Sequence, residues 1–404
     1  MSGEEKRLED LAILGGVPAL SSKVHVGGPN IGHRDRLMER IQDILDCRWL
    51  TNGGAYVREF ERRIAEIAGV RHCLAICNGT VALEIVIRAM GWSGEVIVPS
   101  FTFVATAHAL RCLGITPVFC DVDPRTHNID PAKVEPLITP RTTGILAVHV
   151  WGRPCDTDSL EKIACRHRLG LLFDAAHAFA CSRGGRMIGS FGNAEVYSFH
   201  ATKFVNAFEG GAVVTNDSDL AERVELLRNF GFAGYDRVVS LGTNGKMHEV
   251  SAAMGITSLE SLEEFVAVNR RNYEQYRREL ADTPGLDVMA YDDTERNNYQ
   301  YVVVTVDPDR LTLSRDDFVR ILAAENVMAR RYFYPGCHQM EPYRSEFPDA
   351  CRNLVHTEVL TDRVMCLPTG TNVGPKSIST VCSLLRLAAT HHRELRRLLR
   401  DLVN

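Results

Sequence analysis

Short apolar runs alternate with amphipathic stretches between about residue 70 and residue 216, and this alternation constrains the fold most strongly. The apolar runs are rich in β-branched and aromatic residues and are bounded by Gly, Pro, Asn or Asp, which is typical of buried strands. They span residues 72–77, 95–99, 116–122, 144–151, 170–174, 194–200 and 211–216. Helical patterns occupy residues 80–90, 103–112, 131–138 and 157–168. This order predicts a mainly parallel α/β sheet with helices on both faces.

The last two strands differ from the others. Residues 201–210, which separate them, are too few for a full crossover, so this pair is expected to be antiparallel. The result is a seven-stranded mixed sheet. After residue 216 the pattern changes to a helix at 219–230, a longer helix at 258–280, a strand at 299–307, a helix at 316–327, a strand at 327–333 and a final helix at 376–400. We therefore expect an N-terminal arm and large α/β domain over residues 1–257 and a smaller α+β domain over 258–404.

Composition excludes several classes of function. The chain has 404 residues and a net charge of -5, so it offers no broad basic field for nucleic acid. The opening MSGEEKRLED has no apolar core, and no apolar run could cross a membrane, which favours a cytoplasmic protein. The twelve cysteines form no CxxC motif and are expected to be buried, reduced thiols, as at Cys47, Cys120, Cys181 and Cys366. Neither His391-His392 nor the glycines of GGRMIG (184–189) fit a metal site or a nicotinamide-binding motif.

Three strand ends carry unusual residues, and ligands of open α/β sheets bind at such ends. Asn78-Gly79-Thr80 opens a helix, where free N–H groups suit a phosphate, although a simple helix cap explains the motif equally well. Asp174 closes an apolar strand and either caps the next turn or pairs with a cationic ligand. Lys203 is one of only seven lysines and the one just beyond an apolar strand. It is either an ion-paired structural residue or an amine with a lowered pKa.

These three features together meet the needs of pyridoxal phosphate. The lysine would hold the aldehyde as a Schiff base, and the acid would pair with the pyridinium nitrogen and keep the ring an electron sink. The helix N-terminus would anchor the phosphate.

Ordered motifs along the chain resemble those of the DegT/DnrJ/EryC1/StrS sugar aminotransferases. The resemblance covers roughly residues 25–400 and implies the aspartate-aminotransferase-like fold of fold type I. It rests on NGT at 78–80, PSFTFVATAHAL at 99–110, HVWGRPCD at 149–156, DAAHAFA at 174–180, SFHATKFVNAFEGGAVVTND at 198–217 and LGTNGKMHEVSAAMG at 241–255.

The resemblance assigns roles to individual residues. Lys203 is the Schiff-base lysine, Asp174 the partner of the ring nitrogen, and His177 lies near the phenolic oxygen. Gly79, Thr80 and Ser198 match phosphate-binding positions. Phe103 matches an aromatic residue stacked on the ring, although a core role is the alternative. Asn244 matches a residue that reaches the phosphate from the neighbouring subunit, which implies a homodimer, although it could be an ordinary turn residue.

The C-terminal part is similar to the 4-aminotransferases of deoxysugar and antibiotic biosynthesis. The similar strings are NYQYVVV at 298–304, YFYPGCHQMEPYR at 332–344 and LPTG at 367–370. Candidates for the sugar or nucleotide pocket are Tyr334, His338, Arg330 and Arg331. The implied reaction moves the amine of L-glutamate through pyridoxamine phosphate to dTDP-4-keto-6-deoxy-D-glucose.

Three alternatives stay open. The family also contains sugar 3-dehydratases, but in those a His replaces the lysine. A 3-keto sugar or a cyclitol ketone could be the acceptor. A cofactor-binding regulator without catalysis is the alternative of another class, against which the intact Lys203 and Asp174 argue.

Overall fold

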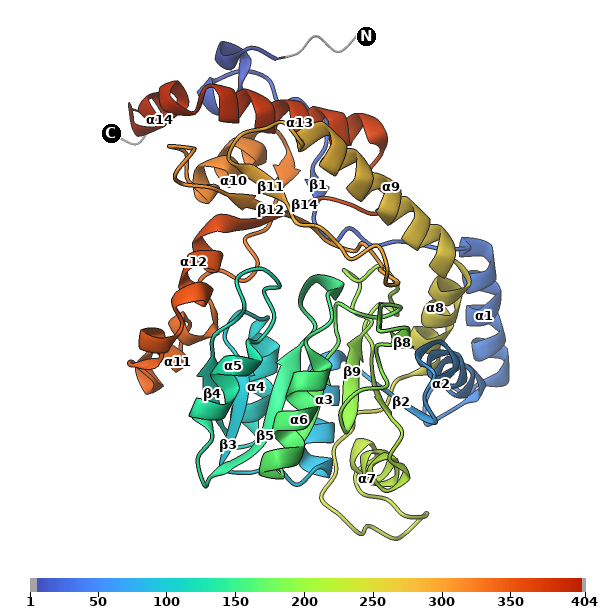
Figure 1. Cartoon of the computed structure of the whole chain (residues 1–404). Helices are drawn as coiled ribbons and strands as arrows, with labels where there is room; N and C mark the ends of the chain where they lie inside the picture. The colour runs from blue at the N-terminus through green and yellow to red at the C-terminus, as the bar shows by residue number, and fades with distance from the viewer. Residues whose placement is uncertain (1–5, 402–404) are drawn as a thin grey trace.

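The computed structural model describes residues 6–401 and centres on a seven-stranded sheet (Figure 1). Its spatial order is β2-β10-β9-β6-β5-β3-β4. The strands are β2 His72–Ile76, β3 Glu95–Pro99, β4 Thr116–Cys120, β5 Thr142–Val148, β6 Gly170–Asp174, β9 Ala194–Ser198 and β10 Gly211–Thr215. β10 is antiparallel to both of its neighbours, and every other adjacent pair is parallel. The predicted mixed sheet and its antiparallel last pair are confirmed.

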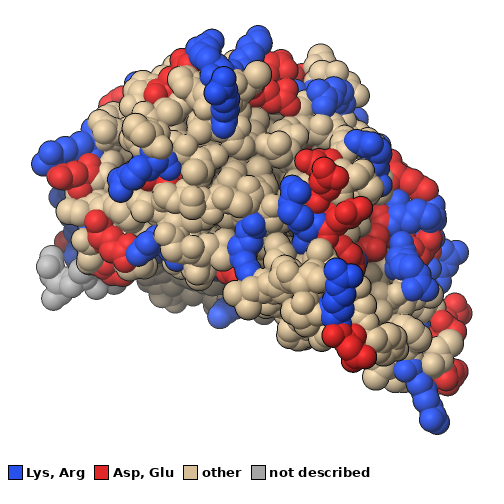
Figure 2. Space-filling view, turned by 90° about the horizontal axis from the view of Figure 1, so that it is seen from below, with Lys and Arg blue, Asp and Glu red and all other residues tan. Residues whose placement is uncertain are grey.

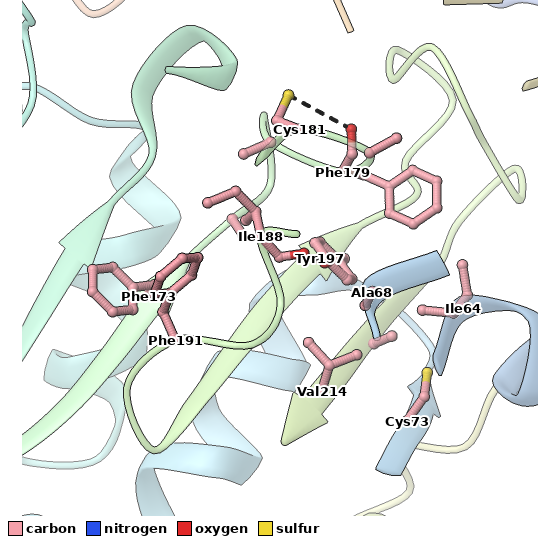
Figure 3. Close-up of a cluster of buried hydrophobic side chains, with 14 of the residues drawn as sticks. Ile64, Ala68, Cys73, Phe173, Phe179, Cys181, Ile188, Phe191, Tyr197 and Val214 are labelled. Carbon is pink, nitrogen blue, oxygen red and sulfur yellow. Dashed lines mark hydrogen bonds between the residues drawn. The ribbon is translucent and has the colours of Figure 1, made fainter. Parts of the chain in front are cut away.

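Helices cover both faces of this sheet, because alternate residues of each strand point to opposite sides. On one face, apolar residues of the strands pack against α3 Gly79–Ala89, α4 Val104–Cys112 and α7 Ser218–Arg228. The other face packs against α2 Ala55–Ala68, α6 Thr157–His167 and α8 Glu249–Glu260. Figure 3 shows part of this second core, where Ile64 and Ala68 of α2 lie over Tyr197 of β9 and Val214 of β10. The predicted coverage of both faces is therefore confirmed.

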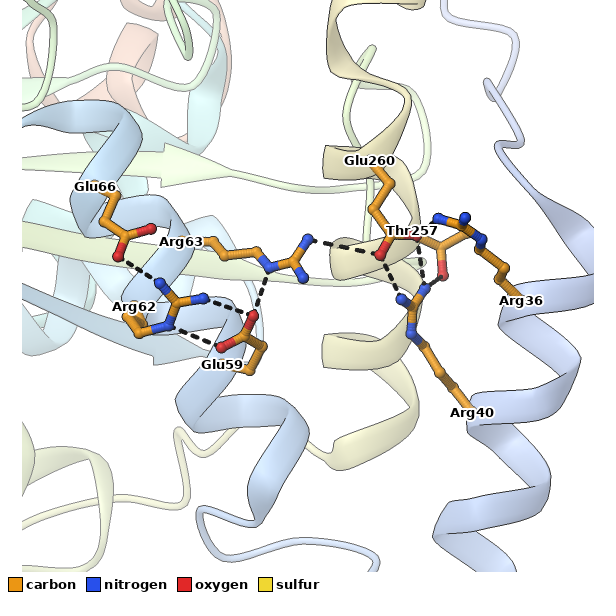
Figure 4. A network of polar contacts seen from close by, with 8 residues as sticks. All are labelled: Arg36, Arg40, Glu59, Arg62, Arg63, Glu66, Thr257 and Glu260. Carbon is orange, nitrogen blue, oxygen red and sulfur yellow. Dashed lines mark hydrogen bonds and ion pairs between the residues drawn. The ribbon is translucent and has the colours of Figure 1, made fainter.

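An ion-pair network joins the helices at the edge of this core (Figure 4). Glu260, at the end of α8, accepts hydrogen bonds from Arg40 at 2.5 Å and from Arg36 at 3.3 Å, both on α1 Arg34–Cys47. Arg63 of α2 lies 3.6 Å from the same carboxylate and 2.6 Å from Glu59. The network ties α1 and α2 to the helix that leads out of the sheet.

The C-terminal part contains a three-stranded antiparallel sheet of order β11-β12-β14. Its strands are β11 Leu286–Val288, β12 Val302–Val306 and β14 Val364–Leu367, and its main helices are α9 Leu262–Leu280, α10 Arg315–Ala324, α13 Pro375–Thr390 and α14 His392–Asp401. A separate apolar core lies between these elements. Leu11 of the N-terminal segment is buried in that core, so the arm packs on the C-terminal part. The domain boundary between residues 257 and 258 stays a prediction.

Several expected boundaries were wrong. The helix expected at 258–280 is interrupted at Ser261, whose backbone leaves the helical region between α8 and α9. The strand expected at 327–333 is only β13 Val327–Met328, because its partner β1 Val24–His25 offers two residues for pairing. Val150–Gly152 is a 3₁₀ turn and not the end of a strand. The final helix divides near His391 into α13 and α14.

The cysteine prediction was partly wrong as well. All twelve thiols are free, and Cys120, Cys181 and Cys366 are buried as expected. Cys47, however, lies on α1 and is exposed, and three cysteines elsewhere in the chain are exposed as well. Among residues 6–401, no helix is both long enough and apolar enough to cross a lipid bilayer.

Candidate active site

Lys203, Asp174 and His177 come together at the carboxyl edge of the sheet. β6 and β9 are parallel neighbours, with Asp174 paired in register with Val196. Asp174 ends β6 and His177 lies three residues later, while Lys203 lies in the loop after β9. Parallel neighbours end at the same edge, so the two loops meet there. The electrostatic fields of Lys203 and Asp174 act on each other, and the ammonium of Lys203 also acts on His177.

The Asp174 carboxylate is buried and held on both oxygens. The Thr106 hydroxyl donates to Oδ2 at 2.9 Å, and the Ala176 N–H donates to Oδ1 at 3.1 Å. Burial raises the pKa of Asp174, and these two bonds and the Lys203 charge oppose that increase. A buried carboxylate of this kind is stabilised when a second cationic group binds beside it.

The Lys203 loop is joined to the N-terminal segment by two buried asparagines, Asn206 of the loop and Asn30 of that segment. Asn30 donates through Nδ2 to the Phe204 carbonyl at 3.0 Å, and Asn206 donates to the Asn30 carbonyl at 2.8 Å. Desolvation lowers the pKa of Lys203 to about 8, against the opposing pull of Asp174. A substantial fraction of the amine is therefore neutral, and thus nucleophilic, near physiological pH.

His177 is buried in a neutral form. The backbone N–H of Trp151 donates to Nδ1 of His177 at 3.2 Å, which leaves the ring proton on Nε2. Burial, and secondarily the Lys203 charge, hold the pKa of His177 well below its usual range. The ring lies between aromatic neighbours, with Tyr301 at 4.5 Å and Phe333 at 5.8 Å between ring centroids. His177 thus presents one N–H donor from a fixed orientation.

A backbone cradle lies where β2 passes into α3. The Asn78 side chain caps α3 by accepting from the Val81 N–H at 2.9 Å, so the N–H groups of Gly79 and Thr80 stay free. A Cβ added to Gly211 would lie 2.6 Å from the Asn78 carbonyl, and one on Gly79 would lie 3.2 Å from Cβ of Ser198. These glycines let three segments approach closely. The helix N-terminus with the adjacent Ser198 hydroxyl suits a phosphate.

A cavity of about 600 Å³ is lined by residues 102–104, which follow β3, and by residues 328–334 of the C-terminal part. Phe103 lines it and is 57% exposed, so its ring is available to a ligand and does not belong to the core. Of the four residues expected in a substrate pocket, Tyr334, Arg330 and Arg331 line this cavity.

His338 does not line this cavity. It is buried, its Nδ1 lies 2.7 Å from the Ser100 hydroxyl, and its Nε2 lies 2.5 Å from Glu358. Both ring nitrogens are thus engaged within the protein. A direct contact between His338 and substrate stays a prediction.

Asn244 pairs with a residue outside the cluster of Lys203, Asp174 and His177. It is exposed and forms an antiparallel bridge with Asn229. Within residues 6–401, no hydrogen bond joins it to any member of that cluster. A role toward the neighbouring subunit stays a prediction.

Three positioning residues escaped the sequence analysis. Thr106 holds Asp174, Asn30 holds the Lys203 loop, and Trp151 sets the ring proton of His177. Thr106 is a hydroxyl residue on the buried side of α4, and its Oγ1 also lies 3.0 Å from Oγ1 of Thr102.

The cluster fits pyridoxal phosphate on its own chemistry. A backbone cradle for a phosphate, a buried acid for a protonated ring nitrogen and a partly neutral lysine for an aldehyde lie at one edge of the sheet. Those are the groups that this cofactor requires of a protein.

Comparisons with known proteins identify the family of the chain. The DegT/DnrJ/EryC1/StrS aminotransferase family model matches residues 32–386. The dTDP-4-amino-4,6-dideoxy-D-glucose transaminase of Shigella dysenteriae is 35% identical over 91% of this chain and 99% of its own.

Two solved structures extend the comparison. The structure of DesI with its TDP-sugar product superposes with a TM-score of 0.94 at 53% identity, covering 98% of this chain and all of DesI. DesV of S. venezuelae, solved with a ketimine intermediate, is 30% identical with a TM-score of 0.82, covering 88% of this chain and 95% of DesV. The chain belongs to the DegT/DnrJ/EryC1/StrS family and is an aminotransferase of fold type I.

Proposed function

We propose that this aminotransferase uses pyridoxal phosphate to move an amino group from L-glutamate to carbon 4 of dTDP-4-keto-6-deoxy-D-glucose. The observation that carries the proposal is that the buried Asp174 and Lys203, whose pKa is lowered to about 8, lie at the carboxyl ends of the neighbouring parallel strands β6 and β9. The choice of sugar is supported by the Shigella dysenteriae relative, whose name specifies a dTDP-4-amino-4,6-dideoxy-D-glucose, and by DesI, solved with its TDP-sugar product.

The bound cofactor supplies an electron sink that stabilises negative charge at the carbon bearing the amine. Asp174 would keep that sink effective, because its carboxylate favours a proton on the adjacent ring nitrogen. Thr106 and Ala176 hold both carboxylate oxygens in place. His177 would donate a hydrogen bond from its Nε2–H to the phenolic oxygen of the cofactor, and Phe103 would cover one face of the cofactor ring.

Lys203 has two tasks in this proposal. Its neutral amine would hold the cofactor at its aldehyde, and Nζ, once free of that bond, would take the proton from the donor α-carbon. The same Nζ would return a proton when the keto sugar is aminated. The bonds from Asn30 and Asn206 keep the loop in one position through both halves of the reaction.

A homodimer belongs to the proposal. Residues 230–241 carry exposed apolar side chains, including Phe230, Tyr235 and Leu241. Asn244 lies three residues after Leu241. Figure 2 views the molecule from below, where uncharged residues fill most of the central surface and charged residues gather toward the edges. A group of exposed apolar side chains like that of residues 230–241 favours association. In a dimer, Asn244 of the partner subunit would reach the phosphate.

Product analysis tests the function directly. Purified enzyme is incubated with pyridoxal phosphate, L-glutamate and a panel of 3-keto and 4-keto nucleotide sugars, and the products are identified by mass spectrometry and NMR. We expect 2-oxoglutarate and a sugar aminated at carbon 4. A product formed only from 3-keto sugars or cyclitol ketones would replace the acceptor. No conversion of any ketone, and no amination of the cofactor by glutamate, would support a regulator.

A further inference from the structure

Arg330 and Arg331 are adjacent in sequence and line the same cavity, but their charges have different partners. The Arg331 guanidinium lies 3.1 Å from Asp316 and 4.7 Å from the centre of the Tyr334 ring. Asp316 also accepts from Nε of the buried Arg315 at 2.6 Å. Arg331 is therefore part of a closed ion-pair group that shapes the wall of the cavity.

Arg330 is fixed by its backbone but keeps its charge available. Its N–H and carbonyl pair with Cys366 of β14 at 3.1 and 2.8 Å, so its Cα position is set by the C-terminal sheet. Its guanidinium lies 5.2 Å from the centre of the Tyr332 ring. Within residues 6–401, no carboxylate forms an ion pair with it. An arginine with this arrangement is ready to bind a carboxylate or phosphate.

The walls of the cavity pack against the catalytic cluster. Phe333 lines the cavity and also stacks on His177. Val26 lines its other side, and the next residue, Gly27, is pressed against Thr202, so that a Cβ at Gly27 would lie 2.9 Å from Cβ of Thr202. Thr202 directly precedes Lys203. The residues that line the cavity therefore lie next to His177 and next to the segment that holds Lys203.

The charges around the cavity favour an anion. Arg315 and Arg331 share the single carboxylate of Asp316, and Arg330 adds a further positive charge. The volume of about 600 Å³ lies within the range of about 300–1,000 Å³ that holds drug-sized ligands, and it is larger than a five-carbon amino acid needs. The aromatic rings of Phe103, Tyr332 and Tyr334 offer surfaces on which a planar base or sugar can pack.

We infer that Arg330 binds the diphosphate of the nucleotide-linked acceptor and so determines its affinity, whereas Arg331 holds the wall of the cavity. This inference rests on the proposed function, since it requires an acceptor that carries a diphosphate. It distinguishes two neighbouring arginines that the sequence alone left equivalent.

Because the two substrates react in separate half-reactions, the test can separate them. The holoenzyme and its R330Q, R331Q and R320Q variants are compared for KM of the keto sugar, for inhibition by dTDP and for the rate at which L-glutamate aminates the cofactor. Arg320 is an exposed residue of α10 outside the cavity lining and serves as the matched control. An R330K variant separates charge from the two-pronged guanidinium geometry.

We expect R330Q to raise KM for the keto sugar and weaken dTDP inhibition by about tenfold or more, which is the loss expected for a charge-assisted contact. The glutamate half-reaction should change less than about twofold, and R331Q should affect the acceptor far less than R330Q. Equal effects of R330Q and R331Q, or an effect of R330Q on glutamate alone, would overturn the inference. If the wild-type enzyme aminates no nucleotide sugar, the proposed function itself fails, which is a separate outcome.

Discussion

The Thr106 hydroxyl donates a hydrogen bond of 2.9 Å to Oδ2 of Asp174 and so joins the helix after β3 to the end of β6. These strands are not adjacent, since β5 lies between them in the sheet. The bond fixes one carboxylate oxygen, while the Ala176 N–H fixes the other. The orientation of the proposed ring-nitrogen partner is therefore set by a side chain of α4 and by the backbone of the turn after β6.

Removing the hydrogen bond between Thr106 and Asp174 should lower the affinity for the cofactor. In Thr106→Ala the buried carboxylate loses a donor, so the pKa of Asp174 should rise further and its charged form should become less favourable. We expect turnover to fall about tenfold or more, in line with roughly 1.5–3 kcal/mol for a hydrogen bond to a charged group. Cofactor affinity, followed by absorbance, should fall in parallel. Thr106→Ser keeps the hydroxyl and is the control; equal losses in both variants would argue against the bond.

The pKa of Lys203 should be measurable in the cofactor-free protein. Competitive labelling with an amine reagent, quantified by mass spectrometry of the peptide containing Lys203, should show a midpoint near pH 8 and not near the usual 10.5. Because Asp174 raises this pKa, Asp174→Asn should move the midpoint to lower pH. A midpoint that stays near 10.5 would contradict the desolvated amine.

The same shift has a defined sign for stability. The folded protein binds the Lys203 proton less tightly than the unfolded chain does, so between about pH 8 and 10.5 the unfolded state holds more protons. The Lys203 contribution to stability should therefore increase as pH rises through this window. The difference in unfolding free energy between wild type and Lys203→Met, measured at several pH values, isolates this contribution. A contribution that decreases as pH rises through the window would contradict the assigned shift.

His177 should stay neutral across the physiological range. ¹⁵N NMR of the labelled protein should show the Nε2–H tautomer at neutral and mildly acidic pH, because Nδ1 accepts from Trp151 and burial lowers the pKa. His177→Gln can keep a donor, whereas His177→Phe keeps only a ring and should lose about tenfold or more in turnover. A His177 titration near pH 6.5 would contradict this picture.

Subunit complementation tests the shared site. Lys203→Ala and Asn244→Ala are prepared as separate variants of low activity and then mixed under conditions that exchange subunits. If Asn244 serves the neighbouring site, a mixed dimer contains one site with neither lesion, and activity should rise well above that of either parent. Absence of rescue in mixed dimers confirmed by mass spectrometry would show that Asn244 does not complete the partner site.

Local pattern predicted the elements that carry the chemistry. The seven strands, the antiparallel last pair and the placement of Lys203 and Asp174 beyond strand ends all follow from apolar runs and their boundaries. Contacts between residues far apart in the chain could not be predicted from local sequence pattern. The bond from Asn30 to the Lys203 loop joins residues far apart in sequence, and the pairing of β1 with β13 depends on where the N-terminal segment lies on the C-terminal core. The break at Ser261 also depends on tertiary packing, since residues on both sides of it favour a helix.

The role of Lys203 is the centre of this account, and reduction of the holoenzyme with borohydride tests it most directly. Reduction fixes the cofactor to the amine that holds it, and peptide mass spectrometry then identifies the residue. We predict that the modification lies on Lys203 and that Lys162→Ala, which removes a lysine of α6, leaves it unchanged. Modification of any of the other six lysines, or none in an active holoenzyme, would contradict the assignment.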